Sequence, residues 1–210
     1  MINVLLVDDH RLVRTGIRTI LEDTPGIKIV AEAESGEQAV DMVAQHHPDV
    51  VLMDASMPGM GGLEATRKLL RNHPNTKIIA LTVHSNEPFP SRFLKAGVAG
   101  YITKDCGADE MISAVKAVFR GERYIGNKIA QQLALSSLNP GGSDSPFNGL
   151  SDREMQVMMM VIKGKKAQEI SDQLCISPKT VNTYRYRLFE KLGVEGDVEL
   201  AHLAMRHGIE

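Results

Sequence analysis

Apolar residues follow a regular pattern along the first 121 residues of this 210-residue chain. Short β-branched runs alternate there with amphipathic stretches, which is typical of strands and helices in a parallel sheet. The five predicted strands are residues 3–7, 28–33, 50–53, 77–81 and 100–102, and the five predicted helices are residues 10–23, 36–46, 62–72, 88–96 and 108–120. Because the strands are almost continuously apolar, helices must cover both faces of the sheet. The pattern therefore predicts a doubly wound α/β fold of (βα)5 order, in which ligands bind at the carboxyl ends of the strands.

The pattern breaks down at residues 136–149, where Ser, Gly, Pro and Asn accumulate as in a flexible connector. A short amphipathic stretch before it, residues 128–135, predicts a linker helix. We therefore expect a first domain of residues 1–121, a linker of residues 122–147 that contains this helix, and a second domain of residues 148–210.

Helical periodicity returns after the connector and predicts an all-α domain of four helices, at residues 152–163, 167–174, 178–192 and 198–206. Ser151 and Glu154 have the spacing of a capping box, and Ser177 with Pro178 is an N-cap followed by proline at the first helical position. Asp197 is the expected cap of the last helix. The short turn between the second and third helices, together with the many polar residues of the third, predicts a helix-turn-helix.

Charge and composition narrow the function classes. The net charge of −2 argues against a nonspecific coat for nucleic acid, but residues 163–191 hold seven bases against three acids, a local excess of about +4 that can meet phosphates. No run approaches the roughly 18 apolar residues of a membrane span, and the first strand begins without a basic leader. The two cysteines, Cys106 and Cys175, lack metal-ligand spacing. We expect a soluble cytoplasmic protein without a membrane partner.

Three acidic residues follow two of the predicted strands. Asp8 and Asp9 come directly after residues 3–7, and Asp54 comes directly after residues 50–53. The carboxyl ends of parallel strands meet at one edge of a sheet, so we expect these carboxylates to lie close together. Mg²⁺ is held by one or two carboxylates, and the acids would repel one another without a cation. The sequence predicts a Mg²⁺ site at this edge.

A hydroxyl and an ammonium group follow two later strands. Thr82 comes after residues 77–81, and Lys104 comes shortly after residues 100–102. Lys104 can pair with phosphoryl oxygens, and Thr82 can donate a hydrogen bond to a phosphoryl group when one is present. A carboxylate can attack phosphorus where such groups stabilise the loose transition state and hold the donor in line. Asp54 is therefore the candidate phosphoacceptor.

The segments VLLVDDH, VLMDASMPGMGGLEA, LTVH and GYITKD resemble the receiver domains of two-component response regulators, which have a flavodoxin-like fold. The resemblance implies that a sensor histidine kinase phosphorylates Asp54. The Mg²⁺ ligands that it implies are the carboxylates of Asp8, Asp9 and Asp54 and the backbone carbonyl of Ser56. The phosphate-binding and aromatic switch residues that it implies are Thr82, Lys104 and Tyr101. Such a protein is a phosphoacceptor and not an enzyme, with at most slow self-catalysed phosphorylation and dephosphorylation.

Two details bear on the switch. Many receivers have a proline after the lysine, whereas Asp105 follows Lys104 here. A cis peptide without proline costs about 3–4 kcal/mol, so the resemblance leaves the geometry of the loop after Lys104 open. The segment of residues 84–90 has two prolines and no periodicity, and we expect it to be mobile and to transmit the change to the following helix.

The third helix of the second domain has two different faces. Its apolar residues, spaced three, four and four, are Val181, Tyr184, Leu188 and Leu192. The residues expected on the opposite face are Asn182, Thr183 and Tyr186, with Lys179, Arg185 and Arg187 beside them. Recognition helices place N-terminal residues against base edges and basic neighbours against phosphates. Asn182 can read adenine with two hydrogen bonds, and the methyl group of Thr183 can contact thymine.

The run LSDREMQVMMMVIKGKKAQEISDQLCISPKTVNTYRYRLFEKLGV resembles the four-helix output domain of NarL/FixJ (LuxR-type) response regulators. The segments SPKTVNTYRYR, FNGLSDRE and GDVELAHLA are most similar in sequence to the GacA/UvrY type of these regulators. The partner implied is double-stranded DNA. The contact residues implied are Asn182, Thr183 and Tyr186 toward the groove and Lys166, Lys179 and Thr180 toward the backbone. Arg187, a basic neighbour on the same helix, is added as a further candidate for DNA contact.

A domain of about 60 residues offers one recognition helix, so tight specific binding by a monomer is not expected. We therefore expect a homodimer when the protein is phosphorylated. The candidate dimer contacts are Leu200, Leu203 and Ala204 on the last helix and, as weaker candidates, Val13 and Ile17 on the first, although each of them could equally belong to a core.

The preferred hypothesis is a transcription factor in which phosphorylation of Asp54 shifts a two-state receiver and controls dimerisation and sequence-specific DNA binding. One alternative is an aspartyl-phosphate phosphatase, but such an enzyme needs an acid two residues after the nucleophile, where Ser56 stands here. Another alternative is an RNA-binding output domain. It fits the basic segment less well, because RNA-binding modules stack bases on aromatic residues of a sheet and this segment is a helix without such a platform.

Overall fold

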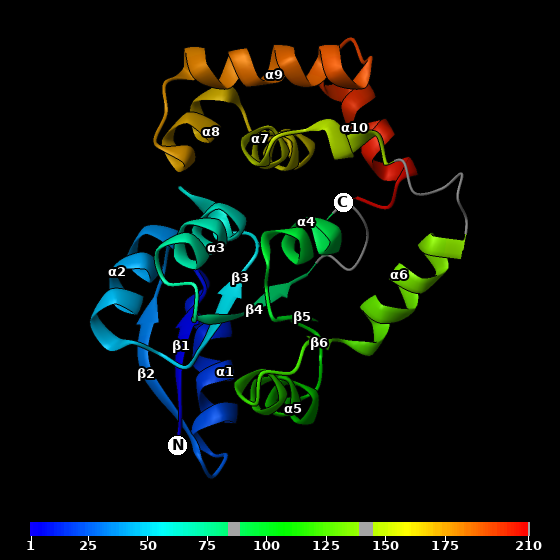
Figure 1. Cartoon of the computed structure of the whole chain (residues 1–210). Coiled ribbons are helices and arrows are strands. Elements are labelled where there is room, and N and C mark those ends of the chain that lie inside the picture. Colours follow the sequence, from blue (N-terminus) through cyan, green and yellow to red (C-terminus); the bar gives the residue numbers. More distant parts are fainter. Residues whose placement is uncertain (84–88, 139–144, 210) are drawn as a thin grey trace. The chain divides into compact units, whose positions relative to one another are not determined.

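The computed structural model describes residues 1–83, 89–138 and 145–209. These residues fold into two compact units (Figure 1). The first consists of residues 1–83 and 89–135, and the second includes residues 145–209. Within these stretches, no helix combines the length and the apolar character that crossing a membrane requires.

A parallel sheet lies at the centre of the first unit, with six strands among the described residues (Figure 1). The strands are β1 (Ile2–Val7), β2 (Ile27–Ala33), β3 (Val50–Asp54), β4 (Lys77–Thr82), β5 (Gly100–Thr103) and β6 (Tyr124–Ile125). Their order in space is β2-β1-β3-β4-β5-β6, so the direction of the chain through the sheet reverses between β1 and β3. Doubly wound sheets bind ligands outside the carboxyl ends of the strands at such a reversal. These are the two strands that end in the predicted acids.

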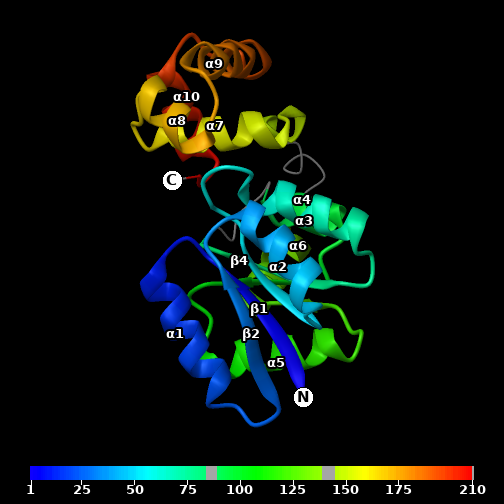
Figure 2. The same cartoon turned by 90° about the vertical axis from the view of Figure 1, so that its left-hand side faces the viewer.

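Helices cover both faces of this sheet. They are α1 (Arg11–Glu22), α2 (Gly36–His46), α3 (Gly61–Asn72), α4 (Phe89–Ala96), α5 (Ala108–Phe119) and α6 (Asn127–Leu138). Successive strand residues point to opposite faces. Val4 and Leu6 accordingly join a buried cluster with residues of α1 and α5, whereas Leu5 and Val7 join another with residues of α2, α3 and α4. Figure 2 shows α1 on one side of the sheet and α2 with α3 on the other.

The predicted doubly wound fold and its (βα)5 order are confirmed, and each of the five strands and five helices ends within one residue of its expected position. The strand β6 was missed, because two residues are too few to show a period. The connector predicted at residues 136–149 is partly wrong: α6 continues to Leu138, and a 3₁₀ turn, η1, covers Pro146–Gly149. The rest of that connector, residues 139–144, and residues 84–88 of the expected mobile segment lie outside the described residues.

The described part of the second unit contains α7 (Asp152–Ile162), α8 (Ala167–Leu174), α9 (Pro178–Leu192) and α10 (Asp197–Arg206) after η1. The predicted capping box is confirmed, since Ser151 Oγ accepts from the N–H of Glu154 at 3.3 Å and the Glu154 carboxylate accepts from the N–H of Ser151 at 2.7 Å. Ser177 caps α9 by accepting from the N–H of Thr180 at 3.1 Å. Lys191 of α9 lies 2.7 Å from the Glu154 carboxylate, which ties α9 to α7.

The prediction that Asp197 caps α10 is wrong. Gly196 is the N-cap residue, and no side chain fills the cap. The carboxylate of Asp197 instead accepts from Nη2 of Arg185 in α9, with its two oxygens at 2.7 and 2.6 Å. The guanidinium carries a positive charge, so pairing with it adds an electrostatic attraction that a neutral backbone N–H does not supply. Arg185, expected beside the DNA-facing residues, is therefore engaged in joining α9 to α10.

Three of the candidate dimer contacts are core residues. Leu200 and Ala204 of α10 and Ile17 of α1 are buried within their own units, whereas Leu203 and Val13 are half-buried. Apolar residues that recur three or four positions apart on a helix form the stripe that faces the core. This is why residues predicted as dimer contacts are instead buried.

Candidate functional site

The carboxyl edge of the sheet brings the predicted acids together. Asp54 is the last residue of β3, and Asp8 directly follows β1. The side chains of both are buried, whereas that of Asp9 is 25% exposed. Each buried carboxylate accepts from a backbone N–H two residues later, Asp8 from His10 at 2.8 Å and Asp54 from Ser56 at 3.0 Å. These bonds fix the orientation of both carboxylates.

Lys104 joins this cluster from the end of β5. Its Nζ lies 2.8 Å from Oδ2 of Asp54 and 2.7 Å from Oδ2 of Asp8. Burial raises the pKa of Asp54 and outweighs the opposing effect of the Lys104 ammonium. Burial also lowers the pKa of Lys104, but the carboxylates of Asp54 and Asp8 outweigh it, and that pKa is raised. Lys104 is therefore held as an ammonium, and its charge is what offsets the cost of burying the two acids.

A divalent cation fits the donors at this edge. Within the described residues, Asp8, Asp9, His10 and Asp54 each offer one ligand atom, and these atoms lie within 4.8 Å of one another. Three carboxylates suit Mg²⁺, which prefers oxygen ligands and retains several waters. The predicted cluster of acids is thus confirmed, while His10 was not predicted, although it directly follows the two acids in the sequence. Its Nδ1 lies 3.0 Å from Oδ1 of Asp9.

Thr82 and Tyr101 lie on the two strands beside the acids. Thr82 is the last residue of β4 and is fully buried, and its carbonyl accepts from the N–H of Lys104 at 2.7 Å. Tyr101 in β5 is also fully buried, with its ring centroid 5.8 Å from that of Phe93 in α4. These positions leave three roles as predictions: Thr82 as a phosphate ligand, Tyr101 as a switch, and the carbonyl of Ser56 as a metal ligand.

The loop after Lys104 is held by side chains. The N–H of Cys106 donates to the carbonyl of Thr103 at 3.1 Å, which closes a turn. A hydrogen bond from the Thr103 side chain and the ammonium of Lys128 in α6, 3.3 Å away, lower the pKa of Asp105. Where many receivers have a proline, this chain therefore has an acid that binds both its own loop and the following linker helix.

Two residues that the sequence did not single out support the acids from behind. The buried guanidinium of Arg14 donates to the carbonyl of Asp8 at 2.6 Å. Helix α3 begins so close to β3 that a Cβ on Gly62 would lie 1.9 Å from the carbonyl oxygen of Asp54. Paired glycines before an amphipathic stretch are a readable signal of close approach, whereas an arginine on such a stretch gives none.

The residues predicted to face bases share one exposed face of α9. Asn182, Thr183 and Tyr186 are exposed, Tyr186 at 73%. The hydroxyl of Thr183 donates to the carbonyl of Lys179 at 3.0 Å, so the methyl group is the part that can meet a base. This face has the polar and apolar groups that base edges require.

The predicted backbone contacts are distributed around that face. Lys179 and Arg187 are exposed on α9, and Lys166 is exposed directly before α8. Thr180 differs from them, since it is half-buried and its hydroxyl lies 2.8 Å from Oγ of Ser177 in the helix cap. Its hydroxyl therefore already has a partner.

Comparison with known proteins agrees with both halves of this arrangement. Residues 4–116 match the response regulator receiver domain, and residues 148–204 match the luxR family of bacterial regulatory proteins. Response regulator UvrY of Escherichia coli (strain K12) is 58% identical over 209 residues, which cover 100% of this chain and 96% of UvrY. Response regulator GacA of Pseudomonas viridiflava is also 58% identical over 209 residues, covering 100% of this chain and 98% of GacA.

A solved structure of RcsB from Salmonella enterica serovar Typhimurium, bound to promoter rprA in the presence of phosphomimetic BeF3−, is similar along nearly the whole chain. It is 28% identical with a TM-score of 0.70, covering 96% of this chain and 97% of RcsB. The two resemblances seen in the sequence are confirmed, including the likeness to GacA and UvrY.

Proposed function

Because the chain belongs to the two-component response regulators with a LuxR-type DNA-binding domain, we propose that a sensor histidine kinase phosphorylates Asp54 and that the phosphate controls DNA binding. The observation that carries the proposal is the position of the Lys104 ammonium between the buried carboxylates of Asp54 and Asp8. A cation at that point can reach a phosphoryl group carried by Asp54. The end of β1 supplies acids for a metal site, and the end of β3 supplies the nucleophile. The ends of β4 and β5 supply a hydroxyl and a cation.

In the proposed reaction, an oxygen of Asp54 attacks the phosphorus of a phosphohistidine. The P–N bond breaks, its electron pair leaves with the imidazole of the kinase, and an acyl phosphate forms on Asp54. Lys104 pairs with the phosphoryl oxygens, and Thr82 donates its hydroxyl hydrogen to them. Asp8, Asp9 and Asp54, with the carbonyl of Ser56, would hold Mg²⁺, which would supply charge neutralisation of the phosphoryl oxygens. Apart from slow self-catalysed phosphorylation and dephosphorylation, no enzymatic turnover is part of the proposal.

In the output half, α9 acts as the recognition helix. Asn182, Thr183 and Tyr186 face the bases in the major groove, and Lys179 and Arg187 neutralise phosphates beside it. Lys166 contacts the DNA backbone from the start of α8, and Thr180 does so less directly because its hydroxyl is engaged in the helix cap. The exposure of the polar face of α9 supports this assignment. RcsB, to which the chain is similar, was solved bound to a promoter.

We place the receiver at residues 1–121, the linker at residues 122–147 and the DNA-binding domain at residues 148–210. The homodimer expected on phosphorylation would use the apolar residues that α10 exposes. These are Val198, 70% exposed, and Met205, 62% exposed, in place of the buried Leu200 and Ala204. A cytoplasmic location follows from the need to meet DNA.

The phosphoacceptor is tested by mixing the full chain with radiolabelled acetyl phosphate and Mg²⁺. Wild type should take up label, and Asp54→Asn should not, since an amide cannot form the acyl phosphate. Asp41→Asn is the matched control, because Asp41 is an exposed acid on α2 and should label normally. Retained labelling of Asp54→Asn would contradict the assignment, and rapid turnover of phosphomonoesters by wild type would favour the phosphatase alternative.

The output is tested with duplex DNA and structured RNA in salt-titrated shift assays. Lys179→Ala should weaken DNA binding about equally for all sequences and reduce the salt slope by about 1, whereas Asn182→Ala should cost about 1–3 kcal/mol and relax specificity at one base pair. Tighter binding of wild type to RNA than to any duplex would favour the RNA alternative.

A further inference from the structure

Arg14 is a buried cation for which the proposed phosphotransfer has no role. It lies in the first half of α1, and its side chain is 8% exposed. All three guanidinium nitrogens are engaged: Nη1 donates to the carbonyl of Asp8 at 2.6 Å, Nε to Glu32 at 2.8 Å and Nη2 to Glu34 at 2.5 Å. A single side chain thus joins the ends of β1 and β2 to α1.

We propose that Arg14 is a positioning residue that sets the affinity of the acidic site for Mg²⁺, an inference that rests on the proposed function. The carbonyl oxygen of Asp8 belongs to the peptide plane that connects Asp8 to Asp9, and that plane is rigid. Holding this oxygen restrains the backbone torsions on either side of the plane, and these torsions set the directions in which both acidic side chains leave the backbone. Partners that orient metal ligands from behind change metal affinity about 10–100-fold when they are removed.

The charges around Arg14 fit a role in positioning Asp8 and Asp9 better than a role in stabilising the fold. Buried ion pairs often contribute little net stability, because removing charges from water costs about as much as their attraction returns. An isolated cation here would also repel Mg²⁺. Glu32 and Glu34, both at the end of β2, offset the charge of Arg14, so its donors reach Asp8 without an unbalanced positive charge beside the site.

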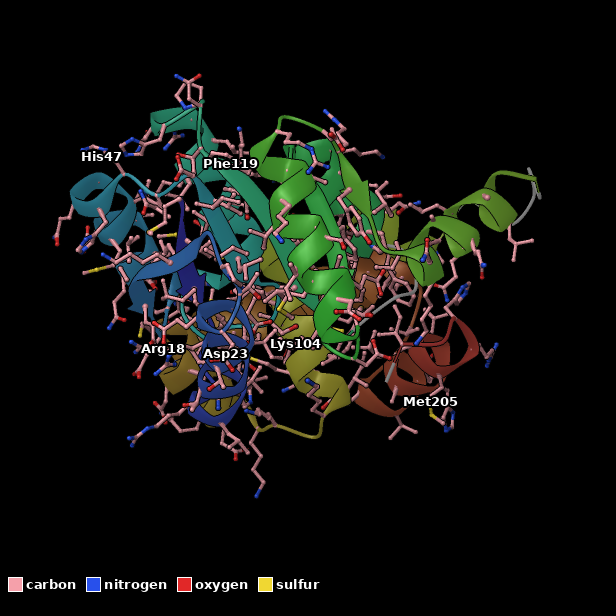
Figure 3. The ribbon with its side chains drawn as sticks, turned by 90° about the horizontal axis from the view of Figure 1, so that it is seen from below. Arg18, Asp23, His47, Lys104, Phe119 and Met205 are labelled. Atoms are coloured by element: carbon pink, nitrogen blue, oxygen red, sulfur yellow. The ribbon has the colours of Figure 1, made fainter. Side chains whose placement is uncertain are left out.

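Arg18 provides a matched comparison one turn further along α1, where Figure 3 labels it. It pairs with the same Glu32 at 2.7 Å and with Glu22 at 3.1 Å, and its side chain is 49% exposed. Its charge and its helix are those of Arg14, but the partners that it binds are carboxylates away from the acidic edge. Replacing Arg18 therefore perturbs the same ion-pair network without releasing the carbonyl of Asp8.

The experiment measures Mg²⁺ binding to the full chain by calorimetry, and phosphorylation by acetyl phosphate over a range of Mg²⁺ concentrations. Arg14→Met should weaken Mg²⁺ binding about tenfold or more, while the phosphorylation rate at saturating Mg²⁺ stays close to that of wild type. Arg14→Lys should fall between the two, because one ammonium cannot engage three fixed partners at once. Arg18→Met should bind Mg²⁺ as wild type does. Thermal melting establishes that each variant is folded.

Equal Mg²⁺ affinity in folded Arg14→Met and Arg18→Met would overturn the inference, as would a rate deficit in Arg14→Met that saturating Mg²⁺ leaves in place. If Arg14→Met does not fold, Arg14→Lys decides by the same two criteria. A wild-type chain that neither binds Mg²⁺ nor takes up phosphate would overturn the proposed function itself. That result differs from one in which wild type binds Mg²⁺ and takes up phosphate but Arg14→Met does so equally well.

Discussion

Gly62→Ala should weaken the receiver and its phosphorylation together, although alanine is the better helix former. A Cβ at residue 62 would lie 1.9 Å from the carbonyl oxygen of Asp54, 2.9 Å from its carbonyl carbon and 3.0 Å from Cα of Ala55. Close C···O contacts in proteins are about 3.3–3.6 Å, so α3 or the end of β3 must shift by roughly 1.4 Å. All three obstacles are backbone atoms, and a change of rotamer cannot relieve the clash.

The expected cost follows from two opposing terms. Overpacking costs about 1–3 kcal/mol, and a clash with backbone belongs at the upper end. Replacing glycine by alanine inside a helix returns about 1 kcal/mol. The net loss of unfolding free energy should be about 2 kcal/mol, or about 8 °C in Tm for a domain of this size.

The control is Gly16→Ala, the same substitution at an exposed position of α1, where a Cβ meets no atom within 4 Å. It should gain about 1 kcal/mol. Calorimetry of the full chain gives both values, with the receiver transition identified as the one that Mg²⁺ raises. Because the peptide after Asp54 must move, Gly62→Ala should also lose most of its phosphorylation rate. A Gly62→Ala protein that melts at or above the wild-type temperature and takes up phosphate normally would refute the reasoning.

Three further predictions concern the second unit. Burial raises the pKa of Glu154, but Lys191 and the groups of the capping box outweigh burial, so the pKa in the folded protein is lowered. The folding stability that the Glu154 carboxylate contributes is therefore present above the unfolded pKa of about 4.3 and is lost as pH falls through the lower folded value. Glu154→Gln should flatten the dependence of Tm on pH in that acidic window, and an unchanged profile would contradict the pairing. Leu188→Ala removes a fully buried side chain of α9 and should cost about 2–4 kcal/mol in denaturant unfolding, so an unaltered midpoint would argue against the packing of α9. Cys175→Gly should leave the unfolding free energy equal or raise it by a few tenths of a kcal/mol. The reason is that Cys175 has a φ of 53°, in the left-handed region that costs residues other than glycine about 1–2 kcal/mol. A clear loss of Tm would show that the thiol of Cys175 contributes to packing.

Features that depend on local patterns could be predicted from the sequence. The apolar strands, each ending in a polar residue, placed Asp54, Thr82 and Lys104 at one edge because parallel strands share a direction. The capping box at Ser151 was equally readable, since both of its hydrogen bonds join residues three apart.

Features that depend on distant partners could not be predicted. The carboxylate of Asp197 binds Arg185, 12 residues away, and so is not a cap. Arg14 reads as one more polar residue of an amphipathic helix until β2 brings Glu32 and Glu34 beside it. Strand β6 exists because the edge of β5 offers it a partner, and that edge is a property of the folded sheet.

On the proposed function, charge must be redistributed in the site when Asp54 takes up phosphate. Asp8, Asp9 and Asp54 carry formally −3 and Lys104 carries +1, so the formal sum is −2, and one Mg²⁺ neutralises it. Phosphorylation replaces the single charge of Asp54 by a charge of about −1.5 to −2. In the proposed phosphorylated state, the groups expected to compensate this charge are the ammonium of Lys104 and the hydroxyl of Thr82.

The two responding groups belong to neighbouring strands, β4 and β5, so any backbone adjustment they require falls on that pair. On its other side β5 pairs with β6, where the N–H of Gly126 donates to the carbonyl of Tyr101 at 2.9 Å. Helix α6 starts at the next residue, and its buried Ile129 belongs to the same apolar cluster as Tyr101. A switch of the β4–β5 pair between two arrangements would therefore alter the support of the linker helix within the receiver itself. On the proposed function, this makes the start of α6 the first part of the connection to the DNA-binding domain that should respond to phosphate.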